Sequence, residues 1–362
     1  MNIIIFTSAN NLSGGSRQAL YQARGLHDRG HRVHFFVPSQ SALIGLDPEA
    51  PFWRFFSGKT PRRAELEALF EVGAANVVHA FHNAAVKALA WWGLFWKKQA
   101  ATAAHRGVIF RPNNPLPYWS PGIDLFLVNS RACGRIIANM GASTQRIRYL
   151  PNAVPDARLT PAIEAHDLRA SFDIGARDLV FLCIGGDAPY KGTKVLLQAW
   201  ALAFGQNSTH TRLVLVGHNP NLWRPLAAEL KIDEQLIFAG QREDVGSFLA
   251  AADAFVLPSL SESMPNTLLE ALRTALPCVG TRVGAVPDIL APQGKAPCGL
   301  LAPPGDANAL CAALRQLADN ADLRRALAQA SALQGRAFHP DKRLDKLEAA
   351  YADILRKKGL PL

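Results

Sequence analysis

The chain has 362 residues, of which 49% are hydrophobic and 19% are charged. This length and composition indicate a globular protein of two domains and exclude a disordered or collagen-like chain. The five cysteines are scattered and form no Cys-x-x-Cys pair. Such spacing favours reduced thiols in a cytoplasmic protein over a disulfide framework or a zinc site.

The formal net charge of +10 arises entirely from the first part of the chain. Residues 1–150 contain 17 Lys and Arg against 7 Asp and Glu, whereas the remainder contains 22 of each. This asymmetry predicts an anionic partner: a phosphorylated substrate, an acidic membrane surface or a nucleic acid. No recognition helix, RNA-binding motif or zinc finger accompanies the charge, so nucleic acid is not expected.

Short apolar runs alternate with helical patterns from the start of the chain. Strands are predicted at residues 3–6, 33–37, 76–79 and 124–129, with a helix over 16–29. The first apolar run is too short for a signal peptide. The longest apolar run, residues 88–96, is shorter than the roughly 20 residues that a spanning helix needs. We therefore expect no secretory leader and no membrane span.

After residue 150 the alternation begins again. Strands are predicted at 179–184, 212–216, 235–238 and 254–257, with helices at 193–204, 222–230, 245–251 and 265–274. Two such series predict two α/β domains, each a doubly wound parallel sheet of the Rossmann-like kind. The domains are placed at 1–155 and 156–340, because 151–177 is polar and contains prolines. The amphipathic final segment, 341–362, is expected to pack on the first domain.

Two glutamates follow the predicted strand at 254–257. Glu262 lies in a loop, and Glu270 lies within the helix that follows. The amides of Asn266, Thr267 and Leu268 would begin that helix, where N–H groups bind anions. Because a carboxylate accepts hydrogen bonds from paired sugar hydroxyls, this arrangement suits a nucleotide-sugar. On spacing alone, solvated carboxylates at a helix start remain the more common explanation.

Glycine-rich turns follow two other predicted strands. Gly185, Gly186, Lys191 and Gly192 precede a helix that begins at residue 193, which suits a phosphate group. Their order matches neither a P-loop nor a dinucleotide fingerprint, so a nicotinamide-dependent dehydrogenase is not expected. A plain turn with a solvated lysine is the alternative. A third turn holds Gly14 and Gly15, where glycine allows close backbone approach to a ligand or simply a tight bend.

Together these motifs resemble the group-1 glycosyltransferases of family GT4, which have the GT-B fold of two Rossmann-like domains facing across a cleft. Seven residues separate Glu262 from Glu270, as in that family's E-x7-E motif, and Lys191-Gly192 resembles its phosphate-binding KG. Further matches follow in order along almost the whole chain: Gly14-Gly15, Arg29-Gly30-His31-Arg32-Val33, Pro151-Asn152-Ala153-Val154, Phe238-Ala239-Gly240, Pro258-Ser259, 283–288 and 299–306.

The resemblance implies a role for each matching residue. Glu270 would bind the ribose, Glu262 the transferred sugar, and Lys191 the diphosphate. His105 would meet the donor sugar, although a lone histidine could equally pack in the core. The remaining candidates would complete the donor site (Gly186, Gly240, Asn266, Thr267 and Leu268) and the phosphate or acceptor loop (Gly14 and Gly15). The family usually has Arg where Gly186 stands, and Arg106 or Arg242 could replace that cation.

The family also implies a retaining hexosyl transfer without a metal. Asp-x-Asp is absent from the sequence, and the His79-x-x-His82 pair is only a weak metal signal. Several amides and a lysine can stand in for a metal at a leaving diphosphate. We expect no cofactor beyond a nucleotide-sugar co-substrate, with UDP as the nucleotide. A noncatalytic nucleotide-sugar-binding scaffold of a glycan assembly complex is the alternative, because the cation at Gly186 is missing.

In this family the first domain binds the acceptor, and here that domain carries the positive excess. The charge therefore predicts an anionic or lipid-linked glycan acceptor, as in cell-envelope polysaccharide or lipopolysaccharide synthesis. Aromatic and basic residues alternate at 91–98 and 51–56, which suits peripheral contact with the inner face of the cytoplasmic membrane. A helix packed in the core is the alternative for 91–98.

Overall fold

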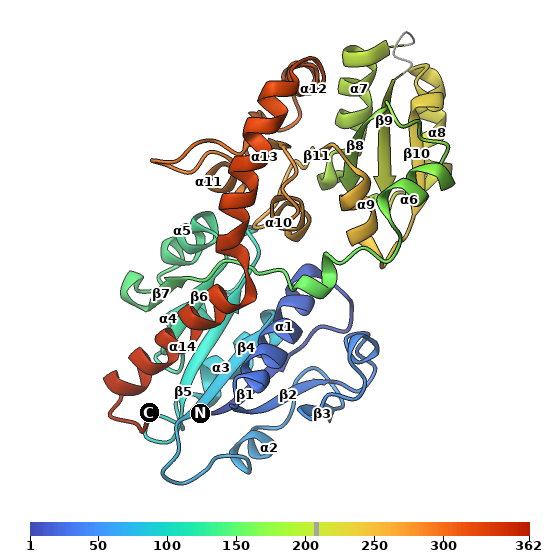
Figure 1. Ribbon diagram of the computed structural model, residues 1–362. Helices are drawn as coiled ribbons and strands as arrows, with labels where there is room; N and C mark the ends of the chain where they lie inside the picture. Colours follow the sequence, from blue (N-terminus) through green and yellow to red (C-terminus); the bar gives the residue numbers. More distant parts are fainter. Residues whose placement is uncertain (206–209) are drawn as a thin grey trace. The chain divides into compact units, whose positions relative to one another are not determined.

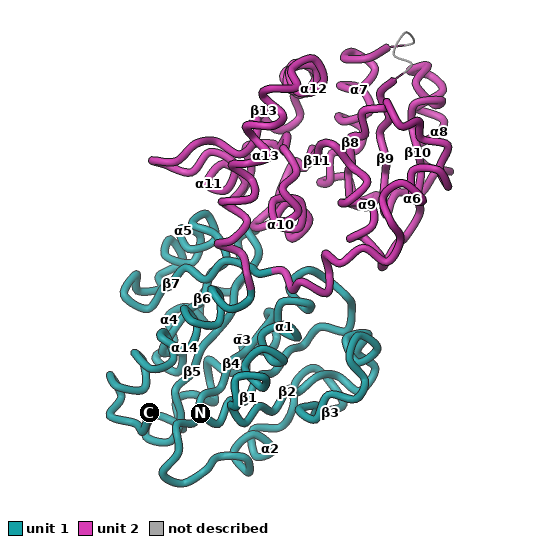
Figure 2. Tube along the Cα trace, in the orientation of Figure 1, with its two compact units in different colours: residues 1–153, 340–362 teal, residues 154–339 magenta. Residues whose placement is uncertain are grey.

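The computed structural model describes residues 1–205 and 210–362 and divides into two compact units (Figure 2). Unit 1 comprises Met1–Ala153 together with Pro340–Leu362, and unit 2 comprises Val154–His339. This division falls two residues before the boundary expected from the sequence. Each unit is a parallel sheet covered by helices on both faces (Figure 1).

The sheet of unit 1 has seven strands in the order β3-β2-β1-β4-β5-β6-β7. Its strands are β1 (Asn2–Thr7), β2 (Arg32–Pro38), β3 (Trp53–Phe56), β4 (Asn76–Phe81), β5 (Ala101–Arg106), β6 (Leu125–Val128) and β7 (Ile147–Tyr149). The helices of this unit are α1 (Gly14–Asp28), α2 (Arg63–Glu67), α3 (Asn83–Trp92), α4 (Leu116–Trp119), α5 (Arg131–Asn139) and α14 (Pro340–Lys357).

Strand β1 shows why both faces of this sheet are covered. Its side chains point to alternate faces, and all six of its residues are buried. Ile3 and Ile5 belong to an apolar cluster with α1 and α14, whereas Ile4 and Phe6 belong to a second cluster with α3 and α5. An uninterrupted apolar run is therefore the expected pattern for this strand.

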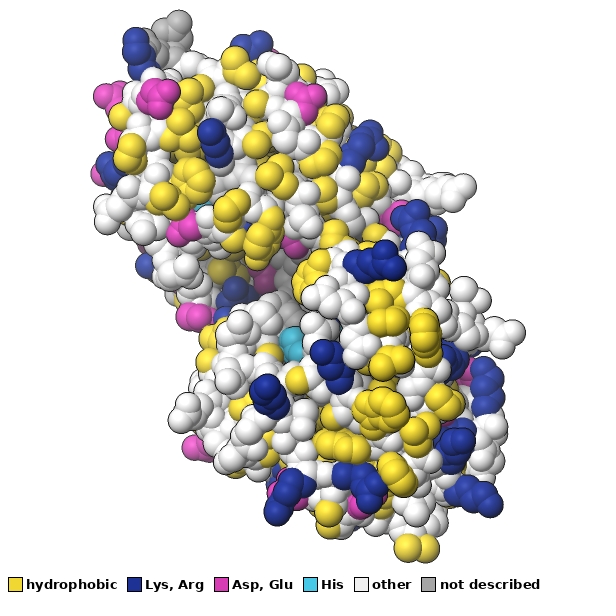
Figure 3. Space-filling model, turned by 180° about the vertical axis from the view of Figure 1, so that it is seen from behind, with side chains coloured by type: hydrophobic (Ala, Val, Ile, Leu, Met, Phe, Trp, Pro, Cys, Tyr) yellow, Lys and Arg dark blue, Asp and Glu magenta, His cyan; other side chains and the backbone are white. Residues whose placement is uncertain are grey.

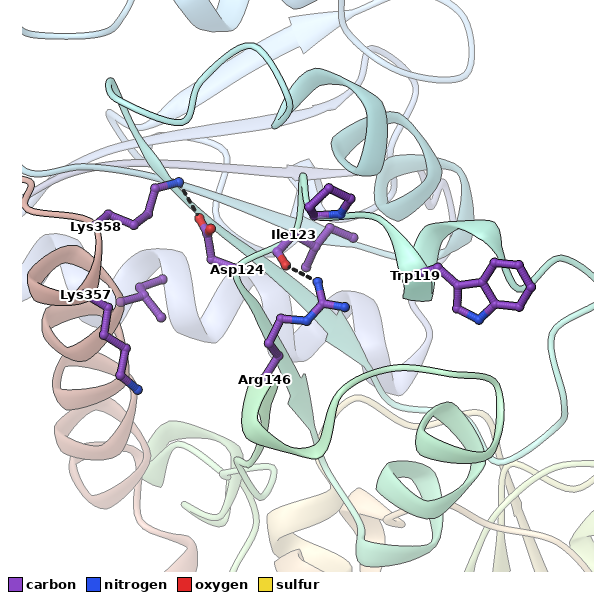
Figure 4. Close-up of a pocket in the computed structure, with 8 residues that line it drawn as sticks. Trp119, Ile123, Asp124, Arg146, Lys357 and Lys358 are labelled. Atoms are coloured by element: carbon purple, nitrogen blue, oxygen red, sulfur yellow. Dashed lines mark hydrogen bonds and ion pairs between the residues drawn. The ribbon is translucent and has the colours of Figure 1, made fainter.

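The last helix belongs to unit 1, where polar side chains as well as apolar ones hold it. Tyr351 of α14 is fully buried, and its hydroxyl lies 2.6 Å from His79 Nδ1 on β4. Near the end of the helix, Lys358 donates to Asp124 at 2.7 Å beside a cavity of about 340 Å³ (Figure 4). No described helix combines the length and the apolar character required to cross a membrane.

The sheet of unit 2 has six strands in the order β10-β9-β8-β11-β12-β13. Its strands are β8 (Leu179–Ile184), β9 (Thr211–Val216), β10 (Leu236–Gly240), β11 (Ala254–Leu257), β12 (Cys278–Thr281) and β13 (Gly299–Ala302). Its helices are α6 (Ala165–Ser171), α7 (Thr193–Phe204), α8 (Pro220–Glu229), α9 (Val245–Ala251), α10 (Asn266–Arg273), α11 (Val286–Leu290), α12 (Ala307–Asp319) and α13 (Ala321–Gly335).

Strand order reverses once in each sheet, and these reversals determine where ligands can bind. In unit 1 the reversal lies between β1 and β4, and in unit 2 it lies between β8 and β11. Chains leave the two central strands in opposite directions at such a point, which leaves a crevice beyond their carboxyl ends. The loops after these four strands are therefore where functional side chains are expected.

Candidate functional site

In unit 2 the loops at the strand reversal carry the two residues that the sequence marks most strongly. Lys191 lies after β8 and Glu262 lies after β11. Lys191 Nζ is 2.7 Å from Glu262 Oε1, and Ser259 Oγ donates to the same oxygen at 3.3 Å. Both charged side chains are mostly buried, with 29% and 13% of their surface exposed. The fold thus brings a cation and a carboxylate together at the carboxyl edge of the sheet.

Glycine at position 192 makes this approach possible. Gly192 has φ +74°, and a Cβ atom there would lie 2.1 Å from the carbonyl oxygen of Pro258. The two loops are also joined by a hydrogen bond from Leu260 N to Tyr190 O of 2.7 Å. Because only glycine fits both the dihedral and the space, the KG pair positions Lys191 against the Glu262 loop.

A second glycine supports the other side of the Glu262 loop. Gly284 has φ +53°, and a Cβ there would lie 1.9 Å from the carbonyl oxygen of Glu262. Ala285 N donates to Ser263 O at 2.8 Å. The family-like block at 283–288 therefore has a physical role, which is to hold the backbone around Glu262.

Helix α10 places Glu270 behind this loop. Pro265 stands at the N-cap position and has no side-chain oxygen, so the first-turn amides of Asn266, Thr267 and Leu268 are not capped by it. Glu270 is only 5% exposed, and Arg158 Nε donates to its Oε1 at 3.3 Å. Arg158 has no signal in the sequence, because it lies in the polar stretch that follows unit 1.

Both candidates for the cation that the resemblance implies at position 186 are held by other groups within their own units. Arg242 donates to Asp244 through Nε at 2.8 Å and through Nη2 at 2.7 Å. Arg106 belongs to unit 1 and donates to Asn83 and to the carbonyl of Phe110. At Gly186 itself a Cβ would meet only the carbonyl oxygen of Gly217, at 3.8 Å, so the position has room for a side chain.

Sequence reasoning missed a histidine beside this glycine turn. His218 follows β9 and is only 2% exposed, and its ring lies 3.2 Å from where a Cβ at Gly185 would be. Burial lowers the pKa of His218, so its imidazole is neutral at pH 7. Its position directly after a strand was the signal available. Gly240, at the end of β10, has φ +69°, and its carbonyl accepts from Gly217 N at 2.7 Å.

In unit 1 the strand reversal brings the Gly14-Gly15 turn against another histidine. A Cβ at Gly15 would lie 3.1 Å from His82 Nε2, and His82 Nδ1 lies 2.7 Å from Thr7 Oγ1. His82 has φ +70°, which is unusual for a residue with a side chain. Burial lowers the pKa of His82 to about 4, so the turn faces a neutral ring.

His105 lies within the end of β5. It is 6% exposed and stacks on Phe81, with the ring centroids 4.7 Å apart. Within the described residues its Nδ1 has no hydrogen-bond partner. Burial holds the pKa of His105 well below its usual value. These features describe a neutral histidine at the carboxyl edge of unit 1.

The two histidines of the His79-x-x-His82 pair lie in different surroundings. His79 is fully buried, and its Nδ1 contacts Gln22 Nε2 at 2.8 Å and the Tyr351 hydroxyl. His82 instead lies beside the Gly15 turn. The described part of the chain contains no group of three or more His, Cys, Asp or Glu residues placed to hold a metal ion.

The aromatic and basic segments of unit 1 are partly core and partly surface. Trp96 is fully buried, whereas Trp91 and Phe95 are 60% and 64% exposed. In the 51–56 segment, Phe55 is exposed and the other three aromatic residues are buried. Helix α3 ends at Trp92, so most of 91–98 is turn and not the core-packed helix, with Trp96 buried and an exposed aromatic edge at Trp91 and Phe95.

Two family models match this sequence. The model described as "Glycosyltransferase Family 4" matches residues 12–158, and the one described as "Glycosyl transferases group 1" matches residues 178–320. The chain is 28% identical over 192 residues to the N-acetyl-alpha-D-glucosaminyl L-malate synthase of Bacillus anthracis, which covers 52% of this chain and 49% of that protein. It is 25% identical over 227 residues to an Escherichia coli galactosyltransferase named for UDP-Gal and alpha-D-GlcNAc-diphosphoundecaprenol. That match covers 61% of this chain and 58% of the E. coli protein. The chain thus spans about half the length of the curated relatives it matches.

The fold is also that of a solved structure. HepE from Anabaena, crystallised in complex with UDP, aligns over 98% of this chain and 100% of its own with a TM-score of 0.83 at 16% identity. At this low identity the likeness shows the fold alone, which is the GT-B arrangement of two Rossmann-like domains. The two family matches cover both units and include the loops that carry Gly15, Lys191 and Glu262. The chain belongs to the group 1 glycosyltransferases of family 4.

Proposed function

We propose that this protein transfers a hexose from a nucleotide-sugar, with UDP as the nucleotide, to a hydroxyl group of an anionic or lipid-linked glycan. The observation that carries the proposal is the contact between Lys191 and Glu262 at the strand reversal of unit 2. A nucleotide-sugar requires a cation for its pyrophosphate beside a carboxylate that accepts hydrogen bonds from the sugar hydroxyls. Lys191 supplies the cation and Glu262 supplies the carboxylate. The named activities of the two relatives and the UDP in the related structure support the choice of donor.

Each group around the pair has a role in holding the donor. Lys191 retains two N–H bonds beyond the one directed at Glu262, and these can bind the diphosphate. The first-turn amides of α10 add partial positive charge at the same edge. Glu262 accepts from hydroxyls of the transferred sugar, and the buried Glu270, held by Arg158, accepts from the ribose. Gly186 and Gly240 leave the backbone open to the donor.

We further propose that the transfer retains configuration at the anomeric carbon and needs no metal. The acceptor oxygen bonds to the anomeric carbon on the face from which the diphosphate departs. The bond between that carbon and the phosphate oxygen breaks, and a phosphate oxygen takes the hydroxyl proton. The leaving group gains negative charge as the bond breaks, so Lys191 and the amides stabilise it more strongly then than before.

The acceptor part of the proposal concerns unit 1. This unit contains 23 Lys and Arg against 11 Asp and Glu, whereas unit 2 contains 16 against 18. Figure 3 shows Lys and Arg side chains beside hydrophobic ones on the lower body, which is unit 1. Malate and a diphosphate-linked lipid, which appear in the names of the two relatives, are anionic acceptors. Peripheral contact with an anionic membrane, through exposed Trp91 and Phe95 beside Lys97 and Lys98, belongs to the same proposal.

Donor turnover by the purified full-length chain tests this function. UDP-, GDP- and ADP-hexoses are each incubated with the protein, in EDTA and with anionic or neutral vesicles, and release of nucleotide is measured. We expect slow release from a UDP-hexose that EDTA does not reduce, together with salt-sensitive binding to the anionic vesicles alone. Glu262→Ala should lower the release about 10²–10³-fold, because it removes a contact to the reacting sugar.

The matched control is Glu229→Ala, an exposed carboxylate at the end of α8 in the same unit. This variant should keep wild-type turnover. Tight UDP binding with no turnover of any donor would favour the noncatalytic scaffold, which the absence of a cation at Gly186 also favours. Loss of all turnover in EDTA would overturn the metal-independent mechanism.

A further inference from the structure

A cavity of about 230 Å³ lies within unit 1, and neither Gly14 nor Gly15 is among the residues that line it. Its wall comes from the start of α3 and from the long loop after β5, which places it at the carboxyl ends of β4 and β5. Lys87 and Val86 line it on the α3 side, and Phe110, Arg111 and Tyr118 line it on the other. The cavity is therefore on the edge of the sheet where parallel α/β domains bind ligands.

The charges around this cavity are all positive. Its lining contains no Asp or Glu, and Lys87 and Arg111 are exposed and form no ion pair within residues 1–205 and 210–362. Two exposed cations at the mouth of a cavity without a counter-charge attract anions.

A third cation, Arg106, contacts residues that line the cavity. Arg106 is only 5% exposed and donates to Asn83 Oδ1 at 3.2 Å and to Phe110 O at 2.6 Å. Its Nε has no hydrogen-bond partner within the described chain, and no carboxylate balances its charge there. The rings of Phe110 and Tyr118 lie 5.6 and 5.8 Å from its guanidinium carbon. A buried guanidinium without an acidic partner is costly, and an anionic ligand would offset that cost.

The cavity beside α14 shows that positive residues alone do not indicate such a site. There Lys358 is neutralised by Asp124, Lys357 pairs with Asp353 at 2.7 Å, and Arg146 donates to the carbonyl oxygens of Ser120, Ile123 and Tyr118 (Figure 4). Each cation in that cavity already has its partners within the protein. Around the Arg111 cavity, Lys87 and Arg111 form no ion pair within the described residues, and Arg106 donates to Asn83 and Phe110 without a carboxylate partner.

We propose that the Arg111 cavity binds one sugar ring of the acceptor that carries a phosphate or carboxylate group, with Lys87 and Arg111 pairing with that group. The volume is below the range of cavities that hold drug-sized ligands and suits a single ring. Phe110 is 60% exposed and offers an apolar face to a sugar ring, while Asn113 and Asn114 offer amide donors and acceptors. The inference rests on the proposed function only in taking the ligand to be the acceptor.

Titration of the intact protein with glucose 6-phosphate tests this proposal. Ligand-observed NMR gives the dissociation constants of glucose 6-phosphate, glucuronate, glucose and inorganic phosphate. We expect saturable binding of the two anionic sugars, weaker binding of glucose and of phosphate alone, and weakening by added salt. The double variant Lys87→Ala/Arg111→Ala should bind glucose 6-phosphate about tenfold or more weakly, because two charge-assisted contacts are lost.

The control is the double variant Lys342→Ala/Lys346→Ala, which removes the same charge from exposed positions on α14 of the same unit. It should keep the wild-type affinity for the sugar phosphate, and all three proteins should bind UDP equally. Equal weakening in both double variants, equal binding of glucose and glucose 6-phosphate, equal binding of inorganic phosphate, or no saturable binding would each overturn the proposal. A protein that binds the sugar phosphate through Lys87 and Arg111 but binds no nucleotide would retain this site and lose the proposed function.

Discussion

At the scale of single residues, Lys191 is the cation that we propose for the diphosphate of the donor, and position 186 supplies no second one. Position 186 holds glycine where the family resemblance implies an arginine, and Arg242 is bound to Asp244. The backbone at Gly186 has no positive φ, and a Cβ would have ordinary contacts there. The cation is therefore missing because residue 186 is glycine, and not because the position lacks room for a side chain.

Gly186→Arg should accordingly strengthen nucleotide binding. A second guanidinium contact to the diphosphate should tighten UDP binding about tenfold at low salt, with a smaller gain at high salt. Isothermal titration of UDP into both proteins measures the change. Gly186→Gln, which is similar in length and uncharged, is the control and should leave the affinity near that of the wild type. If glutamine improves binding as much as arginine, charge is not the reason.

Which residues could be predicted depends on how local their signal is. Lys191, Glu262 and Glu270 lie in motifs with set spacing, and the structure joins the first two directly. Arg158 and His218 were missed because their contacts connect segments far apart in the chain. Arg158 reaches Glu270 across 112 positions, and no spacing rule encodes such a pair.

At the scale of elements, the loop after β8 is held by one glycine. The dihedral of Gly192 and its contact with the Pro258 carbonyl together set where α7 begins and where Lys191 lies. Gly192→Ala should reduce the free energy of unfolding by about 2–4 kcal/mol, since it adds a backbone collision to the strain of a positive φ. Urea unfolding of both proteins measures this difference.

Gly294→Ala separates strain from collision. Gly294 also has φ +74°, but a Cβ there would have no atom within 4 Å. This variant should cost about 1 kcal/mol, which is the strain alone. Equal losses in the two variants would mean that contact with the Pro258 carbonyl does not position the Lys191 loop.

Apolar runs predicted most of the central strands, whereas strands with a weaker hydrophobic pattern were missed. Strand β5 reads Ala-Thr-Ala-Ala-His-Arg, which has too little hydrophobicity to stand out, yet all six residues are buried. Small side chains suffice there because the phenylalanines of neighbouring strands, such as Phe81 and Phe126, fill the space on either side. The peripheral strands β3, β7 and β13 are short and partly exposed, so their pattern is weaker still.

At the scale of the whole molecule, charge separates the two units. Unit 1 has a net charge of +12 and unit 2 a net charge of −2, once the C-terminal helix is counted with unit 1. The sequence located this excess in the first 150 residues, and helix α14 enlarges it. This difference supports the proposal that unit 2 holds the nucleotide-sugar and unit 1 receives an anionic acceptor.

Calorimetric titration of the intact protein with UDP, compared with Lys191→Ala and with the exposed control Lys295→Ala, tests the central claim most directly. The account predicts saturable UDP binding by the wild type and by Lys295→Ala, and binding at least tenfold weaker in Lys191→Ala. Absence of binding to UDP and to other nucleoside diphosphates, or equal affinity in Lys191→Ala and the wild type, would contradict a nucleotide-sugar site at the carboxyl edge of the second sheet.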